Sequence, residues 1–149
     1  MEYRQAKISD VPLFTENRWE FVNTIGKLED EADFKARTEQ YLREHLSQGD
    51  ILVFVAVEGG QIISSCMACI FQLPPLLICP SGKRAEILSV YTKADYRRQG
   101  HAENLLRLLL AELKKKGVGK VSLCYTDVGK PLYQKLGFMD LPHQMELEL

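Results

Sequence analysis

The sequence lacks both a long hydrophobic run and an excess of charge of either sign. No apolar stretch approaches the roughly 20 residues that a transmembrane helix needs, and residues 1–10 are polar, unlike the apolar centre of a signal peptide. Lysine and arginine number 19 against 20 aspartates and glutamates, which leaves a net charge of −1. Because nucleic acid is usually bound by a basic face, we expect neither a nucleic-acid nor a membrane partner, and a cytoplasmic location.

Cysteine is also scarce, and its arrangement argues against a metal or redox centre. Only four cysteines are present in 149 residues, as suits a protein of a reducing compartment. Cys66 and Cys69 have CxxC spacing, but residues 62–71 are predicted to form a strand, on which side chains three residues apart point to opposite faces. No second CxxC or histidine pair completes a ligand set, so no metal is expected.

What the chain does have is the composition of a globular domain, 46% hydrophobic and 26% charged. Its length suffices to bury about two-thirds of the unfolded surface, and we expect one domain over residues 1–149.

Periodicity predicts an α/β order of elements. The predicted strands cover residues 3–7, 51–58, 61–71, 85–92 and 118–126, with final strands at 138 and 144–149. The predicted helices cover residues 9–23, 31–47, 102–116 and 129–137. We expect a side-chain cap at Ser9 or Asp10 to begin the first helix. The strands at 85–92 and 118–126 should be parallel, because a helix connects them.

The junction between the strand at 85–92 and the following helix has the chemistry of an anion site. Arg97 and Arg98 bring positive charge, and Gly100 allows a close approach to the backbone. The helix start itself leaves amides unpaired at the positive end of its dipole. The segment fits neither a Walker loop nor a dinucleotide fingerprint. The alternative is an ordinary helix start with solvated arginines.

Two segments together resemble the GNAT N-acetyltransferase superfamily. The first is the Arg-x-x-Gly-x-Ala run of Arg97, Gly100 and Ala102, which resembles the family's acetyl-CoA signature after its fourth strand. The second is Leu-Tyr-Gln-Lys-Leu-Gly-Phe at residues 132–138. The resemblance implies a mixed central β-sheet with helices on both faces and splayed fourth and fifth strands.

The resemblance also implies acetyl-CoA as co-substrate, without a metal. Its pyrophosphate would lie at residues 97–102, on the backbone amides rather than on the His101 side chain, to which we assign no chemistry. The pantetheine arm would pair with the backbone of the fourth strand near Val90 and Thr92. The cofactor-binding residues expected are Val90, Thr92, Arg97, Arg98, Gln99, Gly100, His101 and Ala102.

The candidate general base is Glu86, acting directly or through a water. A primary amine arrives as an ammonium with a pKa of about 10.4 and must lose a proton before it attacks a thioester. Glu86 lies eleven residues before Arg97, the same offset as the catalytic glutamate of the histone acetyltransferase branch. A carboxylate among Ala85, Ile87 and Leu88 needs an explanation. The alternative is a carboxylate that is solvated or paired with Arg84.

The candidate acid is Tyr133, because the family often places a tyrosine hydroxyl near the CoA sulfur. A phenol with a pKa of about 10 is a weaker acid than a thiol near 8.5, so full proton transfer would be uphill by about 2 kcal/mol. We therefore expect Tyr133 to contribute a hydrogen bond to the thiolate. The alternative is a core tyrosine packed on Leu132, Leu136 and Phe138. Thr126 and Gly129 depart from the family's usual Asn and Ala, which puts one CoA contact in doubt.

The expected function is transfer of an acetyl group from acetyl-CoA to a primary amine by direct attack in a ternary complex. The alternatives are a non-catalytic acyl-CoA-binding regulatory domain and, more remotely, a nucleotide- or RNA-binding module. The acceptor stays open between small molecules and peptides, as does a homodimer. By the resemblance, the N-terminal helices wall the acceptor site with Trp19, Phe21 and Tyr41, and the acidic stretch 29–33 either attracts an amine or is a solvated turn.

Overall fold

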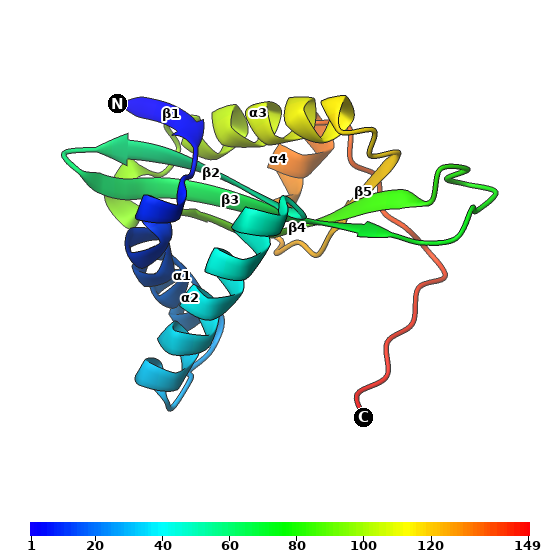
Figure 1. Ribbon diagram of the computed structural model, residues 1–149. Coiled ribbons are helices and arrows are strands. Elements are labelled where there is room, and N and C mark those ends of the chain that lie inside the picture. The colour runs from blue at the N-terminus through cyan, green and yellow to red at the C-terminus, as the bar shows by residue number, and fades with distance from the viewer.

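A five-stranded sheet organises the protein, and the computed structural model describes all of residues 1–149 (Figure 1). The strands lie in chain order, each antiparallel to its predecessor except for the parallel pair β4–β5. They are β1 (Glu2–Gln5), β2 (Ile51–Glu58), β3 (Gln61–Gln72), β4 (Lys83–Thr92) and β5 (Lys120–Leu123). The parallel pair confirms the expectation from the sequence.

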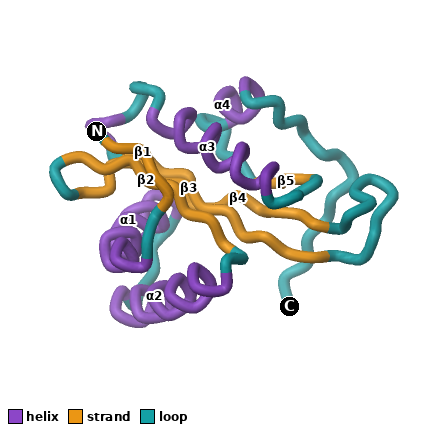
Figure 2. The backbone as a smooth tube through the Cα atoms, turned by 45° about the horizontal axis from the view of Figure 1, so that its top comes forward, coloured by secondary structure: helices purple, strands orange, loops and turns teal.

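Helices cover both faces of this sheet (Figure 2). On one face lie α1 (Val11–Ile25), entered through the 3-10 turn η1 (Ile8–Asp10), and α2 (Glu31–Gln48). On the other lie α3 (His101–Lys115) and the short α4 (Lys130–Lys135); the turn η2 (Ala94–Tyr96) connects β4 to α3. No helix is long and apolar enough to cross a bilayer. The mixed sheet with helices on both faces confirms the predicted fold class.

Two hydrophobic cores form, one on each face of the sheet. Leu52, Phe54 and Ala56 of β2 join the core under α3, whereas the residues between them join the core under α1 and α2. This follows from the alternation of side chains along a strand. The α3 stripe is fully buried and consists of Leu105, Leu106, Leu109 and Leu113. Each such leucine stabilises the fold by about 1.5–3 kcal/mol.

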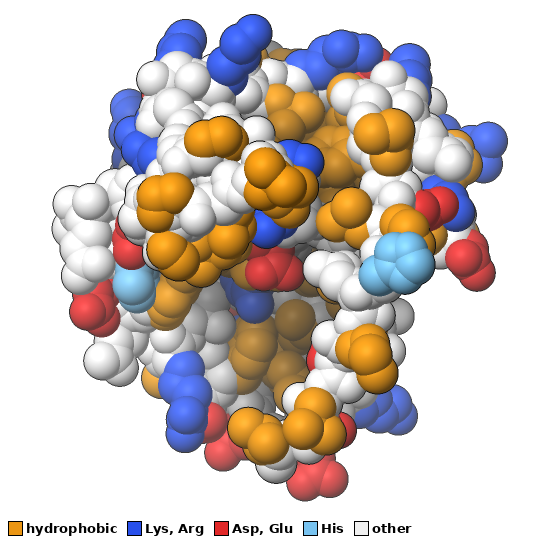
Figure 3. Space-filling view, turned by 90° about the vertical axis from the view of Figure 1, so that its right-hand side faces the viewer, with side chains coloured by type: hydrophobic (Ala, Val, Ile, Leu, Met, Phe, Trp, Pro, Cys, Tyr) orange, Lys and Arg blue, Asp and Glu red, His pale blue; other side chains and the backbone are white.

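The fourth and fifth strands diverge beyond a short paired segment. Their register ends at Ile87 opposite Leu123, whereas β4 continues to Thr92. Ser89 has a φ of 55°, which marks an irregularity in the strand at this point. Figure 3 shows a hollow on the α1/α2 side of the sheet, beneath the loop between β3 and β4. Hydrophobic side chains gather on this loop. The splay predicted by the family resemblance is therefore present.

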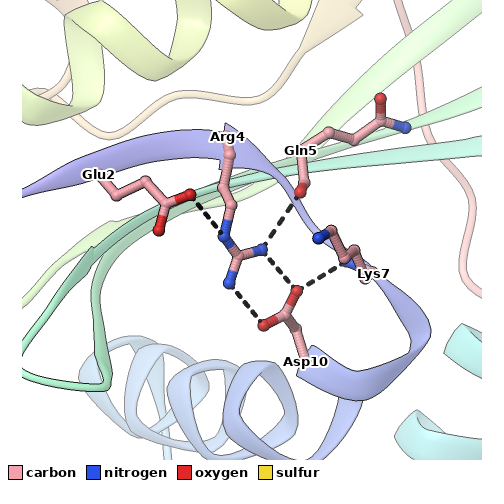
Figure 4. Close-up of polar contacts among 5 residues, drawn as sticks. All are labelled: Glu2, Arg4, Gln5, Lys7 and Asp10. Atoms are coloured by element: carbon pink, nitrogen blue, oxygen red, sulfur yellow. Dashed lines mark hydrogen bonds and ion pairs between the residues drawn. The ribbon is translucent and has the colours of Figure 1, made fainter.

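An ion pair joins β1 to the start of the first helix (Figure 4). Arg4 donates two hydrogen bonds to the carboxylate of Asp10, at 2.7 and 2.9 Å, and the Lys7 amide donates a third at 2.7 Å. The expected side-chain cap on α1 is therefore wrong, since neither Asp10 nor any other side chain caps this helix. Asp10 is 7% exposed, and the Arg4 guanidinium lowers the pKa of its carboxyl group.

The C-terminal part of the chain departs furthest from the sequence prediction. Residues 138–149 form no strand, so the final strands expected at 138 and 144–149 are wrong. Pro142 lacks an amide donor and His143 has a φ of 71°, which bends the chain where pairing would begin. The strand expected at 118–126 is also shorter, because the splay leaves its last residues without a partner on β4.

Candidate active site

Six backbone amides without an acceptor surround the start of α3. The amides of residues 98–103 donate to no group of the protein, and the first backbone bond of the helix runs from the Asn104 amide to the Gly100 carbonyl at 3.0 Å. Arg98 (φ 60°) and Gly100 (φ 83°) both have left-handed backbone. Alternating conformations of this kind turn successive N–H groups into one concave anion-binding surface. The arrangement suits a phosphate or pyrophosphate, as the sequence predicted.

The side chains around these amides form a small cavity of about 220 Å³. Of the predicted cofactor-binding residues it is lined by Thr92, Arg97, Arg98, Gly100, His101 and Ala102; Tyr96, Glu103 and Leu132 complete it. Gln99 and Val90 are not part of this lining.

Two of the lining side chains are held by the protein itself. Arg97 Nε donates to the Thr92 carbonyl at 3.0 Å, which fastens the loop to the end of β4. His101 Nδ1 lies 2.6 Å from the Tyr3 hydroxyl, and the residue is only 7% exposed. The imidazole is therefore engaged in structure, and the amide is the part of His101 that faces an anion.

The irregular segment of β4 leaves a stretch of backbone unpaired on both sides. On the β3 side the register passes from Leu88 opposite Met67 to Tyr91 opposite Ser65, so that Ser89 and Val90 have no partner. On the β5 side the ladder has already ended at Ile87. Backbone groups that lie outside the register of both neighbouring strands are candidates to bind a ligand. This is the position that the sequence assigned to the pantetheine arm and to the thioester.

Glu86 lies on the α1/α2 face of β4. Its neighbours Ala85 and Ile87 belong to the core under α3, so alternation directs Glu86 to the opposite face, where its register partner is Cys69 of β3. The carboxylate takes part in no hydrogen bond and no ion pair. The alternative of pairing with Arg84 is thus not realised, and the carboxylate is available for other chemistry.

Tyr133 comes from the opposite side, on α4. Its ring packs edge-on against Phe138 with centroids 6.0 Å apart, at the margin of the core under α3. Its hydroxyl has no hydrogen-bond partner in the protein, and the residue lines a groove of about 610 Å³ along β5. Burial raises the pKa of this phenol. The side chain is therefore packed like a core tyrosine yet keeps a free, protonated hydroxyl.

Gly129 explains how that ring fits. A Cβ at this position would lie 3.2 Å from Tyr133 Cε2 and 3.4 Å from Thr126 Oγ1. The first distance is tighter than a usual carbon–carbon contact, and the second is at the short end of ordinary contact. The glycine that stands where the family often has alanine thus permits the close packing of Tyr133 on the 126–129 turn.

The acidic stretch 29–33 is structural. The Asp30 carboxylate accepts from the Asp33 amide and caps α2. Glu31 pairs with Lys35 at 2.5 Å, and Asp33 pairs with Arg37 at 2.8 Å. The solvated-turn alternative describes this segment better than attraction of an amine does, since the carboxylates of Asp30, Glu31 and Asp33 already have partners within the protein.

Beneath the sheet, α1 and α2 enclose a cavity of about 390 Å³. Its lining includes Arg18 of α1 and Tyr41 of α2, together with Cys69 and Leu88, which flank Glu86 on the sheet. Sequence reasoning named Tyr41 but missed Arg18. A signal was present, because Arg18 follows the buried Phe14 by four residues and so shares its sheet-facing side.

Comparison with known proteins assigns this chain to a family. A model of the acetyltransferase (GNAT) family matches residues 15–138, which include the amide loop, Glu86 and Tyr133. The chain belongs to the GNAT acetyltransferase family. This membership confirms the resemblance stated from residues 97–102 and 132–138. The site therefore lies in a protein of an acyltransferase family.

Solved structures of this family are similar over nearly the whole chain. A predicted acetyltransferase of Clostridium acetobutylicum, crystallised with acetyl-CoA, has a TM-score of 0.90 and 27% identity over 99% of this chain and 95% of its own. The glucosamine-6-phosphate N-acetyltransferase of Arabidopsis thaliana has a TM-score of 0.77 and 21% identity, with coverage of 99% and 97%. An aminoglycoside N-acetyltransferase in complex with CoA has a TM-score of 0.74 and 16% identity, with coverage of 99% and 98%. Comparison with curated protein sequences returns no match.

Proposed function

We propose that this GNAT acetyltransferase transfers the acetyl group of acetyl-CoA to a primary amine, which attacks the thioester directly in a ternary complex. The observation that carries the proposal is the set of six free amides at residues 98–103, one short turn beyond the splayed end of β4. An anion bound there lets the pantetheine arm run back along the unpaired backbone at Val90. The similar Clostridium acetobutylicum structure, which holds acetyl-CoA, supports the same co-substrate.

The chemistry is divided between the two faces of the sheet. Glu86 faces the α1/α2 side and Tyr133 the α3/α4 side, and the splay between β4 and β5 begins just beyond Glu86, after Ile87. The acceptor would enter from the Glu86 side, and CoA would depart on the Tyr133 side. This separation supports direct attack, because each proton-handling group meets only one of the two substrates.

The reaction then follows in three steps. Glu86 takes a proton from the ammonium, directly or through a water, and leaves a neutral amine. The amine nitrogen bonds to the thioester carbon, while the Val90 N–H donates to the oxygen that gains negative charge. The carbon–sulfur bond then breaks, and the Tyr133 hydroxyl donates a hydrogen bond to the departing thiolate. The attacking nitrogen, which is positively charged after bond formation, loses a second proton, and this proton neutralises the thiolate through water. The products are an N-acetyl amide, CoA with a free thiol, and the first proton, which Glu86 releases to solvent.

The raised pKa of Tyr133 refines its role. A phenol whose pKa lies above its ordinary value of 10.0 stays protonated at neutral pH and is a poor proton donor to a thiolate. Hydrogen bonding to the sulfur, rather than full proton transfer, is the contribution that this environment supports.

The test is thiol release from acetyl-CoA over a panel of primary amines, together with calorimetric titration of CoA. Failure to bind CoA would overturn the proposal. Binding without turnover of any amine would favour the regulatory acyl-CoA-binding alternative. Tyr133→Phe should lower kcat with little change in CoA affinity, and an unchanged kcat would remove Tyr133 from the mechanism.

A further inference from the structure

A guanidinium without a counter-ion lies on the acceptor side of the proposed active site. Arg18 of α1 is largely buried beneath the sheet and lines the cavity of about 390 Å³ there. It donates one hydrogen bond, to Ser89 Oγ, and its Cζ lies 5.9 Å from the centroid of the Phe34 ring. No carboxylate pairs with it.

The residues that line the cavity around Arg18 include no acidic side chain. A second arginine of the lining, Arg37, is already paired with Asp33. The nearest ionisable neighbours of Arg18, Tyr41 and Cys69, are both neutral at pH 7, because burial raises the pKa of the phenol and of the thiol. Glu86 faces the same side of the sheet but forms no ion pair with Arg18, so Arg18 has no direct counter-ion.

Such an arrangement leaves most of the hydrogen-bonding capacity of Arg18 unused by the protein. A guanidinium has five N–H donors, and Arg18 uses one of them on a neutral hydroxyl. Partial desolvation disfavours its charged form and lowers its pKa, so an anion that paired with it would be favoured. Uncompensated groups of this kind are typical of binding sites, where the missing partner belongs to the ligand.

We propose that Arg18 binds a carboxylate or phosphate group of the acceptor, so that the substrates of this site are primary amines that carry an anionic group. The proposal rests on the function proposed above and names its substrate class. The hydroxyl that Arg18 contacts belongs to Ser89, next to Val90, where the thioester carbonyl is placed. An anion on Arg18 thus holds the acceptor beside the reacting carbon, and Glu86 faces the same side of the sheet.

The experiment compares matched acceptors that differ only in the anionic group. One pair is an amino sugar and its 6-phosphate, and the other is an α-amino acid amide and the free amino acid, so that phosphate and carboxylate are tested separately. Wild-type protein should show a kcat/KM at least about tenfold higher for the anionic member of one pair, since a hydrogen-bonded ion pair contributes about this much or more.

The decisive variant is Arg18→Met, with Arg43→Met as the matched control. Arg43 is an arginine of α2 that pairs with Glu39 and does not line the cavity. Arg18→Met should reduce the anionic-to-neutral ratio to about one, whereas Arg43→Met should retain it. Arg18→Met should also leave the melting temperature unchanged or raise it, because it removes a desolvated charge while keeping a long apolar side chain.

Binding measured without turnover separates this inference from the proposed function. Calorimetry of the anionic compounds is done with CoA saturating, so that the amides at 98–103 are occupied. Arg18-dependent binding without acetylation of any amine would leave the inference standing and overturn the proposed function. Turnover with equal kcat/KM for both members of each pair would support the proposed function and overturn the inference. If Arg18→Met lowers kcat/KM equally for neutral and anionic acceptors, the role of Arg18 is purely structural and the inference is overturned. The absence of any anion binding would also overturn the inference.

Discussion

Substitution of Gly100 by alanine tests the amide loop most directly. Gly100 has a φ of 83°, and a Cβ built there meets no atom within 4 Å. The substitution therefore adds no clash with the protein, and its cost to the fold is the strain of a left-handed residue, about 1 kcal/mol. For a protein of this length, that cost lowers the melting temperature by about 3 °C.

The effect on acetyl-CoA binding should exceed what the strain explains. Gly100 lines the cavity of about 220 Å³ that the six free amides surround, so the added methyl group takes space in which the proposed pyrophosphate would lie. If the loop also relaxes from its left-handed backbone, binding must restore that conformation at about 1 kcal/mol, a factor of about five in affinity. We expect CoA to bind about tenfold more weakly or worse.

Gly117→Ala is the matched control. Gly117 follows the other end of α3, has a φ of 79°, and a Cβ there also meets no atom within 4 Å. Both variants should lose the same few degrees in a thermal melt, and only Gly100→Ala should weaken CoA binding in calorimetric titration. Equal CoA affinity of wild-type and Gly100→Ala protein would refute the assignment of this loop to the pyrophosphate. Equal weakening by both variants would show that general destabilisation is the cause.

Three further perturbations probe other parts of the structure. Glu86→Gln should lower kcat about 100-fold, as expected for loss of a general base, with unchanged CoA affinity; a kcat near that of wild type would exclude Glu86 as base. Asp10→Asn should cost about 2 kcal/mol in urea unfolding at pH 7, because it breaks the pair with Arg4. Since the folded pKa of Asp10 lies below its ordinary 3.8, this difference should be complete above about pH 5 and should shrink as the pH falls below 3.8 toward the folded value; a difference that does not shrink as the pH is lowered would contradict the ion-pair account. Gly129→Ala should lower kcat about two- to fivefold by displacing the Tyr133 ring, and an unaltered kcat would show that the ring position does not matter.

Local features of this protein were predictable because their causes lie within a few residues. The amide loop at 98–103 follows from a strand, a glycine and a helix start that are adjacent in the sequence, and the leucine stripe of α3 follows from helical spacing. The β2–β3 hairpin likewise follows from two alternating runs around Gly59 and Gly60. The structure places each of these within two residues of the predicted position.

Features that depend on a distant partner were not predictable in this way. Asp10 has the composition and place of a helix cap, but pairing of β1 with β2 brings Arg4 to it, and a charge-assisted bond prevails over a cap. The alternation at 144–149 is that of a strand, yet a strand needs a neighbouring edge in register, and alternation alone contains no information about one.

The sequence by itself therefore determined the family and predicted an anion site, because the loop at residues 98–103 is one contiguous segment whose amides are oriented by local backbone. It named Glu86 and Tyr133, but it did not place them on opposite faces of the sheet. The tertiary structure alone decided that, and it alone revealed Arg18. The physical reason is that the cavity around Arg18 is built from α1, α2, β3 and β4, and whether a guanidinium there has a counter-ion depends on packing between segments some 70 residues apart, as Arg18 and Ser89 are.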